Sequence, residues 1–169
     1  TKRWGLEKNV EHLCGNFLDY KFEEAKYDVI VSWLALYHIP HRKKLLEICM
    51  KILKSGGSFF AEDFAFHQTF NETELNELSK DFFANYLVSY SDYVSDMKKA
   101  GFKGIKSDDM TSSWSEFTKI RFKAYNENID RHLRVHNKDI VNNMIDFYSF
   151  AMRYLAGGKL GGIRISAKK

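Results

Sequence analysis

The stretch YDVIVSWLALYHIPHRKKLLEICMKILKSGGSFFAEDF, residues 27–64, decides the predicted fold of this chain. Its first seven residues form a β-branched apolar run, which is typical of a parallel strand buried on both faces. Residues 41–53 then carry apolar side chains at helical spacing, and Gly56-Gly57 predicts the end of that helix. The next apolar run, residues 58–64, predicts a second strand. Strand, helix and strand in this order indicate an α/β protein.

The segment between the first strand and the helix contains a candidate functional residue. Tyr37-His38-Ile39-Pro40 follows the first apolar run directly, and Pro40 fits an early turn of the helix. Ligands of α/β proteins bind beyond the carboxyl ends of parallel strands, so His38 lies where chemistry is expected. The alternative interpretation is a histidine that satisfies backbone groups at a helix N-terminus.

Beyond residue 64 the pattern alternates between helices and short strands. We expect helices over 71–87, 90–100, 114–128 and 138–154, and strands over 103–110 and 161–169. Asn71 and Glu74 predict a capping box at the start of the first of these helices. The last strand follows a Gly157-Gly158 turn and is predicted to lie at a sheet edge.

The expected beginning of an α/β sheet is missing from this chain. The chain is expected to start inside a helix and to reach its first strand at residue 27. A doubly wound sheet normally opens with a strand, a glycine-rich loop and a helix, which hold a phosphate or cofactor. No G-x-G-x-x-G motif is present, and GGKLGG lies between a helix and a strand, in the wrong order.

Composition and charge limit the class of protein. The 169 residues are 44% hydrophobic and 15% aromatic, which is enough for the core of one domain and excludes a disordered chain. Lys51 and Lys54 interrupt the longest apolar stretch, so we expect no membrane span and a cytoplasmic protein. The net charge of +4 is scattered, which favours neither nucleic acid nor membrane as a partner. We expect Cys14 and Cys49 to be reduced, and the histidines show no metal-site spacing.

Three motifs resemble S-adenosylmethionine-dependent methyltransferases of the Rossmann-like class: YDVIVSWLALYHI, ILKSGGSFFAEDF and MKKAGF. The resemblance implies a Rossmann-like α/β sheet with helices on both faces, from which the N-terminal strand–loop–helix unit is missing. Residues 1–169 are then a partial methyltransferase domain. Residues 1–66 would be the remaining cofactor-side core, 67–101 the substrate-side helices and 102–169 the C-terminal strands and helices.

Within that family the chain is similar to small-amine N-methyltransferases of the phosphoethanolamine and glycine/sarcosine/dimethylglycine groups. The similarity rests on the spacing from Ser32 to His38, on the segment SDDMTSSW and on the closing helix–turn–strand. Leu34 stands where the phosphobase enzymes have an acidic residue, and Phe64 where they have tyrosine. Their phosphate-holding arginine and tyrosine fall near Phe83 and Asn85. Because a buried phosphate needs charged or multiple donors, phosphoethanolamine is disfavoured, and a neutral or carboxylate-bearing acceptor fits at least as well.

The resemblance implies roles for residues in three groups. His38 would be the catalytic residue that removes a proton, since histidine often moves protons near neutral pH. The implied cofactor-binding residues are Asn16, Phe17, Ser32, Trp33, Leu34 and His38. The implied substrate-binding residues are Tyr37, Asp63, Phe64, Tyr86, Tyr90 and Arg121, and no metal is needed. The alternatives are an ordinary core strand for Leu34, an aromatic core stripe for Tyr86 and Tyr90, and a surface salt bridge for Arg121.

Two functions follow as hypotheses. The first is methyl transfer from S-adenosylmethionine to a small molecule, an amine or an amino-acid-like acceptor. Because half of the cofactor site is missing from this chain, another chain or segment would have to supply it. The second is a methyltransferase-like scaffold or partner-binding subunit that has lost catalysis. A nucleic-acid methyltransferase would require a clustered basic surface, which the charge pattern does not indicate.

Overall fold

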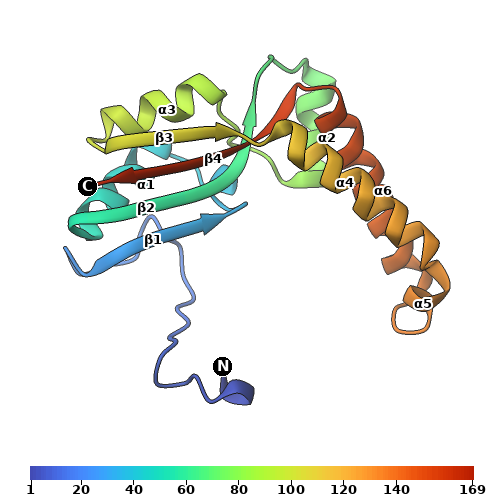
Figure 1. Ribbon diagram of the computed structural model, residues 1–169, viewed down its shortest axis with the longest axis horizontal. Coiled ribbons are helices and arrows are strands. Elements are labelled where there is room, and N and C mark those ends of the chain that lie inside the picture. Colours follow the sequence, from blue (N-terminus) through green and yellow to red (C-terminus); the bar gives the residue numbers. More distant parts are fainter.

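The computed structural model describes all residues, 1–169, and forms a four-stranded sheet with helices packed against it (Figure 1). The strands are β1 (Tyr27–Trp33), β2 (Leu53–Phe66), β3 (Lys103–Asp109) and β4 (Leu160–Lys168). Their spatial order is β1-β2-β4-β3, with β1 parallel to β2 and β4 antiparallel to both of its neighbours. The helices are η1 (Lys2–Trp4), η2 (Leu36–His38), α1 (Arg42–Ile52), α2 (Glu72–Phe82), α3 (Tyr90–Lys99), α4 (Thr111–Glu127), α5 (Ile129–Leu133) and α6 (Lys138–Ala156).

The predicted strand–helix–strand unit is confirmed, although its boundaries move. α1 begins two residues after Pro40 and ends before Leu53, where β2 starts at once. Gly56 and Gly57 therefore belong to β2, and the prediction that they end the helix is wrong. Gly56 adopts a left-handed φ of 73°, and a Cβ on Gly57 would lie 2.9 Å from the carbonyl oxygen of Lys54. The two glycines allow a tight bend at the start of the strand.

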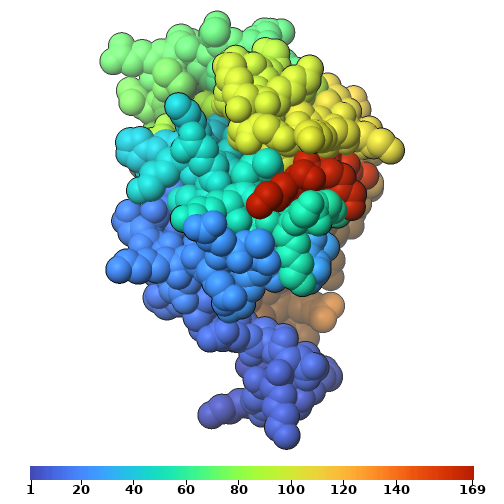
Figure 2. Space-filling view, turned by 90° about the vertical axis from the view of Figure 1, so that its left-hand side faces the viewer, coloured from blue at the N-terminus to red at the C-terminus, as the bar shows by residue number.

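The last strand lies inside the sheet, so its predicted edge position is wrong. Ile163 is paired with Asp63 of β2 on one side and with Asp109 of β3 on the other. Figure 2 shows the red C-terminal end between the yellow surface of β3 and the blue-green surface of α1 and β2. A central position also suits its composition, because Ile163, Ile165 and Ala167 alternate along the strand and are buried.

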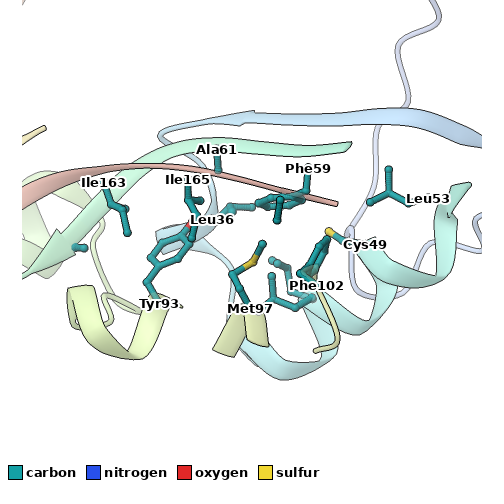
Figure 3. Close-up of a cluster of buried hydrophobic side chains, with 14 of the residues drawn as sticks. Leu36, Cys49, Leu53, Phe59, Ala61, Tyr93, Met97, Phe102, Ile163 and Ile165 are labelled. Carbon is teal, nitrogen blue, oxygen red and sulfur yellow. The ribbon is translucent and has the colours of Figure 1, made fainter. Parts of the chain in front are cut away.

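One face of the sheet is fully covered by α1 and α3. Leu45 and Leu46 of α1 are fully buried, as are Tyr93 and Met97 of α3. These side chains meet Phe59 and its neighbours in a cluster of 15 buried residues. Figure 3 shows them between the helices and the strands, with Tyr93 and Met97 reaching up toward the sheet. Burial of this cluster is the main favourable contribution to folding.

The opposite face is covered only in part. Phe64 of β2 packs against Trp114 of α4 in a second buried cluster formed largely with α2 and α6. Along β1 no helix covers this face, where Val29 is 52%, Val31 47% and Trp33 66% exposed. The expectation of helices on both faces therefore holds near Phe64. At β1 the apolar face is open, and because β1 is the first strand in the sheet order, its outer edge has no partner strand.

Several other expectations can be compared with the structure. The capping box of Asn71 and Glu74 is confirmed, but α2 ends at Phe82 because Phe83 is left-handed. At the N-terminus only the three-residue η1 is helical, so the expectation that the chain starts inside a helix of the α/β fold is wrong. Residues 1–16 are exposed and lead away from the sheet (Figure 1). α5 was not predicted.

Both cysteines are free, with Cys49 buried and Cys14 exposed. None of the helices combines the length and the apolarity that a membrane crossing requires.

Gly162 allows α4 to pack on the sheet, which makes it a test of this architecture. A Cβ on Gly162 would lie 2.5 Å from two ring atoms of Trp114. We expect Gly162→Ala to push α4 outward and to lower the free energy of unfolding by about 1–3 kcal/mol. Urea unfolding of the variant measures this. Gly15→Ala is the matched control, because its Cβ meets nothing closer than a Tyr20 carbon at 3.8 Å. Equal stability of both variants would contradict the packing.

Candidate functional site

The β1–α1 connection contains an unusual concentration of strained backbone. Leu34 with φ 49° and His41 with φ 55° are left-handed and bracket the single turn η2. Phe83, with φ 53°, lies next to this turn in space, and only Ala25 among the other non-glycine residues has a positive φ. Non-glycine residues in this conformation persist where surrounding structure holds them, and they cluster at functional sites. The connection at the carboxyl end of β1 is therefore the candidate site.

His38 is exposed within this connection and its tautomer is fixed by one contact. Its Nδ1 lies 3.1 Å from the carbonyl oxygen of Phe83. A carbonyl oxygen only accepts hydrogen bonds, so Nδ1 carries the proton and donates it. The other nitrogen, Nε2, then keeps its lone pair and is the atom that accepts a proton. The ring also stacks on Tyr37 with centroids 3.8 Å apart.

Aromatic side chains pack around His38. Tyr37 is buried, and its ring meets the edge of Phe64 at 5.2 Å. The backbone N–H of Tyr86 donates to the carbonyl oxygen of Tyr37 at 3.2 Å. Burial, with a further contribution from the charge of Asp63, raises the pKa of Tyr37 to about 12, so its hydroxyl is neutral near neutral pH. The structure thus brings four predicted residues together: Tyr37, His38, Phe64 and Tyr86.

Asp63 does not face an open site, contrary to the expectation that it contacts a substrate. Its side chain is fully buried on the face covered by α1 and α3, while Phe64 points to the opposite face. The Tyr93 hydroxyl donates to Asp63 Oδ2 at 3.2 Å. Burial raises the pKa of Asp63 to about 7, and the nearby Arg42 partly opposes that rise. Because neighbouring strand residues alternate between faces, only one of Asp63 and Phe64 could have faced the site.

Tyr90 and Arg121 also lie away from His38. Tyr90 is stacked on His67, with centroids 5.4 Å apart, and packs at the border of the first buried cluster. Arg121 lies along α4, which projects away from the sheet (Figure 1). There it lines a separate small cavity of about 190 Å³ together with Arg131 and His132. Tyr90 is thus part of the core border, unlike Tyr86, and Arg121 belongs to a helical projection that sequence spacing did not reveal.

The residues expected to bind a cofactor fall into two groups. Ser32 and Trp33 end β1, and Leu34 begins the connection to α1. Trp33 and Leu34 expose 66% and 43% of their surface beside His38. Asn16 is used within its own turn, since its Oδ1 accepts the N–H of Leu18 at 3.0 Å. Phe17 is half-buried and packs on Phe22 with ring centroids 5.0 Å apart. Of the two groups, only Ser32, Trp33 and Leu34 lie close to His38 along the chain.

A groove beside Phe83 was missed by the sequence analysis. It has a volume of about 740 Å³ and lies between α2 and α6. Two cationic and two anionic side chains line it beside three phenylalanines: Lys80, Arg153, Asp81, Asp146, Phe83, Phe147 and Phe150. Its two walls are some 60 residues apart along the chain, so no local pattern indicates it. The neutral charge balance suits a small molecule that carries both signs of charge.

Comparison with known proteins agrees with this arrangement. Residues 1–61 match the family model described as a methyltransferase domain. This segment of the chain is thus similar to methyltransferase domains. The matched residues include β1, the His38 turn and the first part of β2.

Individual relatives of this chain are distant and longer. It is 25% identical over 140 residues to the phosphoethanolamine N-methyltransferase of Plasmodium falciparum, covering 80% of this chain and 52% of the relative. A sarcosine/dimethylglycine N-methyltransferase of Aphanothece halophytica is 36% identical over 59 residues, covering 35% of this chain and 21% of that protein. The chain thus spans about half, or less, of the length of the curated relatives it matches.

A solved structure shares the fold of this chain. Phosphoethanolamine N-methyltransferase 2 of Haemonchus contortus, in complex with phosphomonomethylethanolamine and S-adenosylhomocysteine, superposes with a TM-score of 0.83. At 21% identity the match covers 90% of this chain and 36% of that one. The likeness establishes the Rossmann-like methyltransferase fold of this chain.

Proposed function

We propose that this chain forms the acceptor side and part of the cofactor side of an enzyme that methylates a small molecule with S-adenosylmethionine. The observation that carries the proposal is the exposed His38, with Nε2 free, at the carboxyl end of β1 in a methyltransferase fold. The preferred acceptor is an amine or an amino-acid-like molecule. The mixed charges of the groove beside Phe83 favour such an acceptor over a purely anionic one.

The residues at the end of β1 fit one side of the cofactor. Trp33 and Leu34 present exposed apolar surface next to His38, and such surface suits the apolar part of a nucleoside ligand. When bound, S-adenosylmethionine supplies an electrophilic methyl group on a positively charged sulfur. The protein then has to align the acceptor, exclude water and accept one proton.

His38 is proposed to accept that proton. As the acceptor nitrogen forms its bond to the methyl carbon and the sulfur–carbon bond breaks, the nitrogen becomes positive and releases a proton to His38 Nε2. The carbonyl oxygen of Phe83 then faces the Nδ1–H of a positively charged ring at 3.1 Å, which stabilises the charge. Stacking on Tyr37 limits rotation of the ring, so Nε2 keeps one direction.

The open apolar face of β1 is the proposed place for the rest of the cofactor site. Val29, Val31 and Trp33 lie exposed on one face of a strand that also has a free edge. A strand added at this edge and a helix packed on this face would bury them, as in other α/β sheets. We propose that a strand–loop–helix segment, in the same polypeptide or in another chain, packs here and completes the cofactor site.

The same open face supports a second candidate, a partner-binding subunit without catalysis. Exposed apolar patches often mark protein interaction sites. Asn16 also favours this alternative, because its side chain is already engaged with Leu18 and Asp19.

Calorimetric titration tests the proposal. S-adenosylmethionine and S-adenosylhomocysteine are titrated first into this chain, and then into a version extended at the N-terminus by the strand–loop–helix segment. We expect binding only to the extended protein, which then warrants a screen of ethanolamine, glycine and sarcosine as acceptors. Trp33→Lys in the extended protein should abolish binding, whereas Lys106→Gln, on the exposed outer strand β3, should not. If neither form binds S-adenosylmethionine or S-adenosylhomocysteine, the proposal of an enzyme is wrong and that of a partner-binding subunit remains.

A further inference from the structure

A charged group is buried in the core directly beneath the His38 turn. Asp63 is fully buried, and its only side-chain hydrogen bond comes from the Tyr93 hydroxyl. The guanidinium carbon of Arg42 lies 3.6 Å from the centre of the Tyr93 ring. Three buried atoms of this cluster have no hydrogen-bond partner: Asp63 Oδ1, Arg42 Nε and one terminal nitrogen of Arg42. Such a group costs stability unless it is paired, so its presence calls for an explanation.

The cluster joins three elements that are distant in the sequence. Asp63 belongs to β2, Arg42 is the first residue of α1, and Tyr93 belongs to α3. Arg42 Nε also lies 3.8 Å from a carboxylate oxygen of Asp96 on α3. The charges that face Asp63 are thus Arg42 and, beyond it, Asp96, while Tyr93 and Tyr37 contribute neutral hydroxyls.

Asp63 is linked through Tyr93 to the end of the His38 turn. The Tyr93 hydroxyl donates to Asp63, and the Arg42 guanidinium lies over the Tyr93 ring. Arg42 directly follows His41, the last residue of the turn. The turn contains left-handed Leu34 and His41, a conformation that must be held by its surroundings. The buried contacts from Asp63 through Tyr93 to Arg42 supply such a restraint at the end of the turn.

We propose that ionised Asp63, with Arg42 and Tyr93, is a positioning device that holds the Leu34–His41 turn and thereby fixes His38. Asp63 acts through the turn and touches neither acceptor nor cofactor. Loss of its charge, by substitution or by protonation, releases the turn while the sheet stays folded. Since burial raises the pKa of Asp63 to about 7, this release would occur close to neutral pH.

Hydrogen exchange of individual backbone amides, measured by NMR on this chain, tests the proposal. The reporters are the N–H groups of His38, Ile39 and Tyr86, which donate to carbonyl oxygens of the turn. In Asp63→Asn we expect their protection factors at pH 8 to fall by about tenfold, as for a lost hydrogen bond to a charged group. Amides of the β2–β4 pairing should stay within about twofold. Wild type at pH 5.5 should resemble the variant.

Two further variants keep the result interpretable. Glu62→Gln changes the preceding carboxylate, on the opposite face, and should leave the turn unchanged. Tyr93→Phe removes only the hydroxyl and should lower turn protection by about threefold, even if Asp63→Asn folds poorly. Equal loss of protection in the turn and in the sheet, or an unchanged turn at pH 5.5, would overturn the proposal. It rests on the proposed function only for the role of His38, and exchange needs no ligand, so either proposal can fail alone.

Discussion

Replacement of His38 by asparagine should lower kcat by about 10²–10³-fold in the extended, cofactor-binding protein, with little change in cofactor affinity. The asparagine amide can still donate to the Phe83 carbonyl as Nδ1 does, at 3.1 Å in the native chain, but it has nothing at the position of Nε2. The substitution therefore removes the proton acceptor and keeps the anchor. Turnover with saturating acceptor, and separate calorimetry of S-adenosylhomocysteine, measure the two effects.

His67→Asn is the matched control for this experiment. His67 bonds to Thr111 Oγ1 at 3.1 Å and is stacked on Tyr90, away from the His38 turn. Its replacement should leave kcat within about twofold. If His38→Asn kept more than half of the native kcat, His38 would not be the base. If it lost cofactor binding as well, a structural role for His38 would account for the result.

The second large effect concerns stability and pH, and its sign follows from Asp63. Burial raises the pKa of this carboxyl from 3.8 to about 7 in the folded chain. The folded state therefore holds the proton more tightly than the unfolded state. Protonated Asp63 therefore contributes to the free energy of unfolding. This contribution is fully present below about pH 4 and is lost as the pH rises through 7. Between pH 5 and pH 8 wild type should lose about 2–3 kcal/mol relative to Asp63→Asn.

Urea unfolding of both proteins at pH 5, 6, 7 and 8 measures this difference. Glu62→Gln is again the control, because the Glu62 side chain is partly exposed and pairs with Arg164 at 2.6 Å. Its stability relative to wild type should change by less than about 0.5 kcal/mol over the same range. A constant difference between wild type and Asp63→Asn would mean that Asp63 is ionised or neutral throughout. The global stability and the order of the His38 turn should thus change in opposite directions with pH.

Local patterns were sufficient to predict much of the fold. Apolar runs located β1 and β2, and β3 and β4 also lie where strands were expected. The Asn71–Glu74 pair located the start of α2. The position of β4 was missed because its pairing partners lie up to 110 residues away, as Ser58 and Lys168 do. A Gly-rich start also looks the same at an edge and at the centre of a sheet. The role of Gly162 appears only once Trp114 is known to lie above it.

The candidate site was predicted less completely, for physical reasons. His38, Tyr37 and Phe64 were found because the end of a parallel strand is a general location for ligands. Asp63 was assigned to the wrong environment, since sequence alternation gives the face of a strand but not what covers it. The anchor at Phe83 depends on a left-handed backbone in a non-glycine residue, which leaves no mark in the sequence. The groove between α2 and α6 depends on tertiary packing alone.

The free edge of β1 has a practical consequence for handling this chain. Its outer backbone groups have no partner strand, and Val29, Val31 and Trp33 lie exposed beside them. Such an edge is a template for another extended segment, including the same strand of a second molecule. Purified alone, the chain should therefore be sparingly soluble and should associate increasingly with concentration, whereas charged residues on the outer edge, such as Lys103 and Lys106 of β3, protect the other end of the sheet.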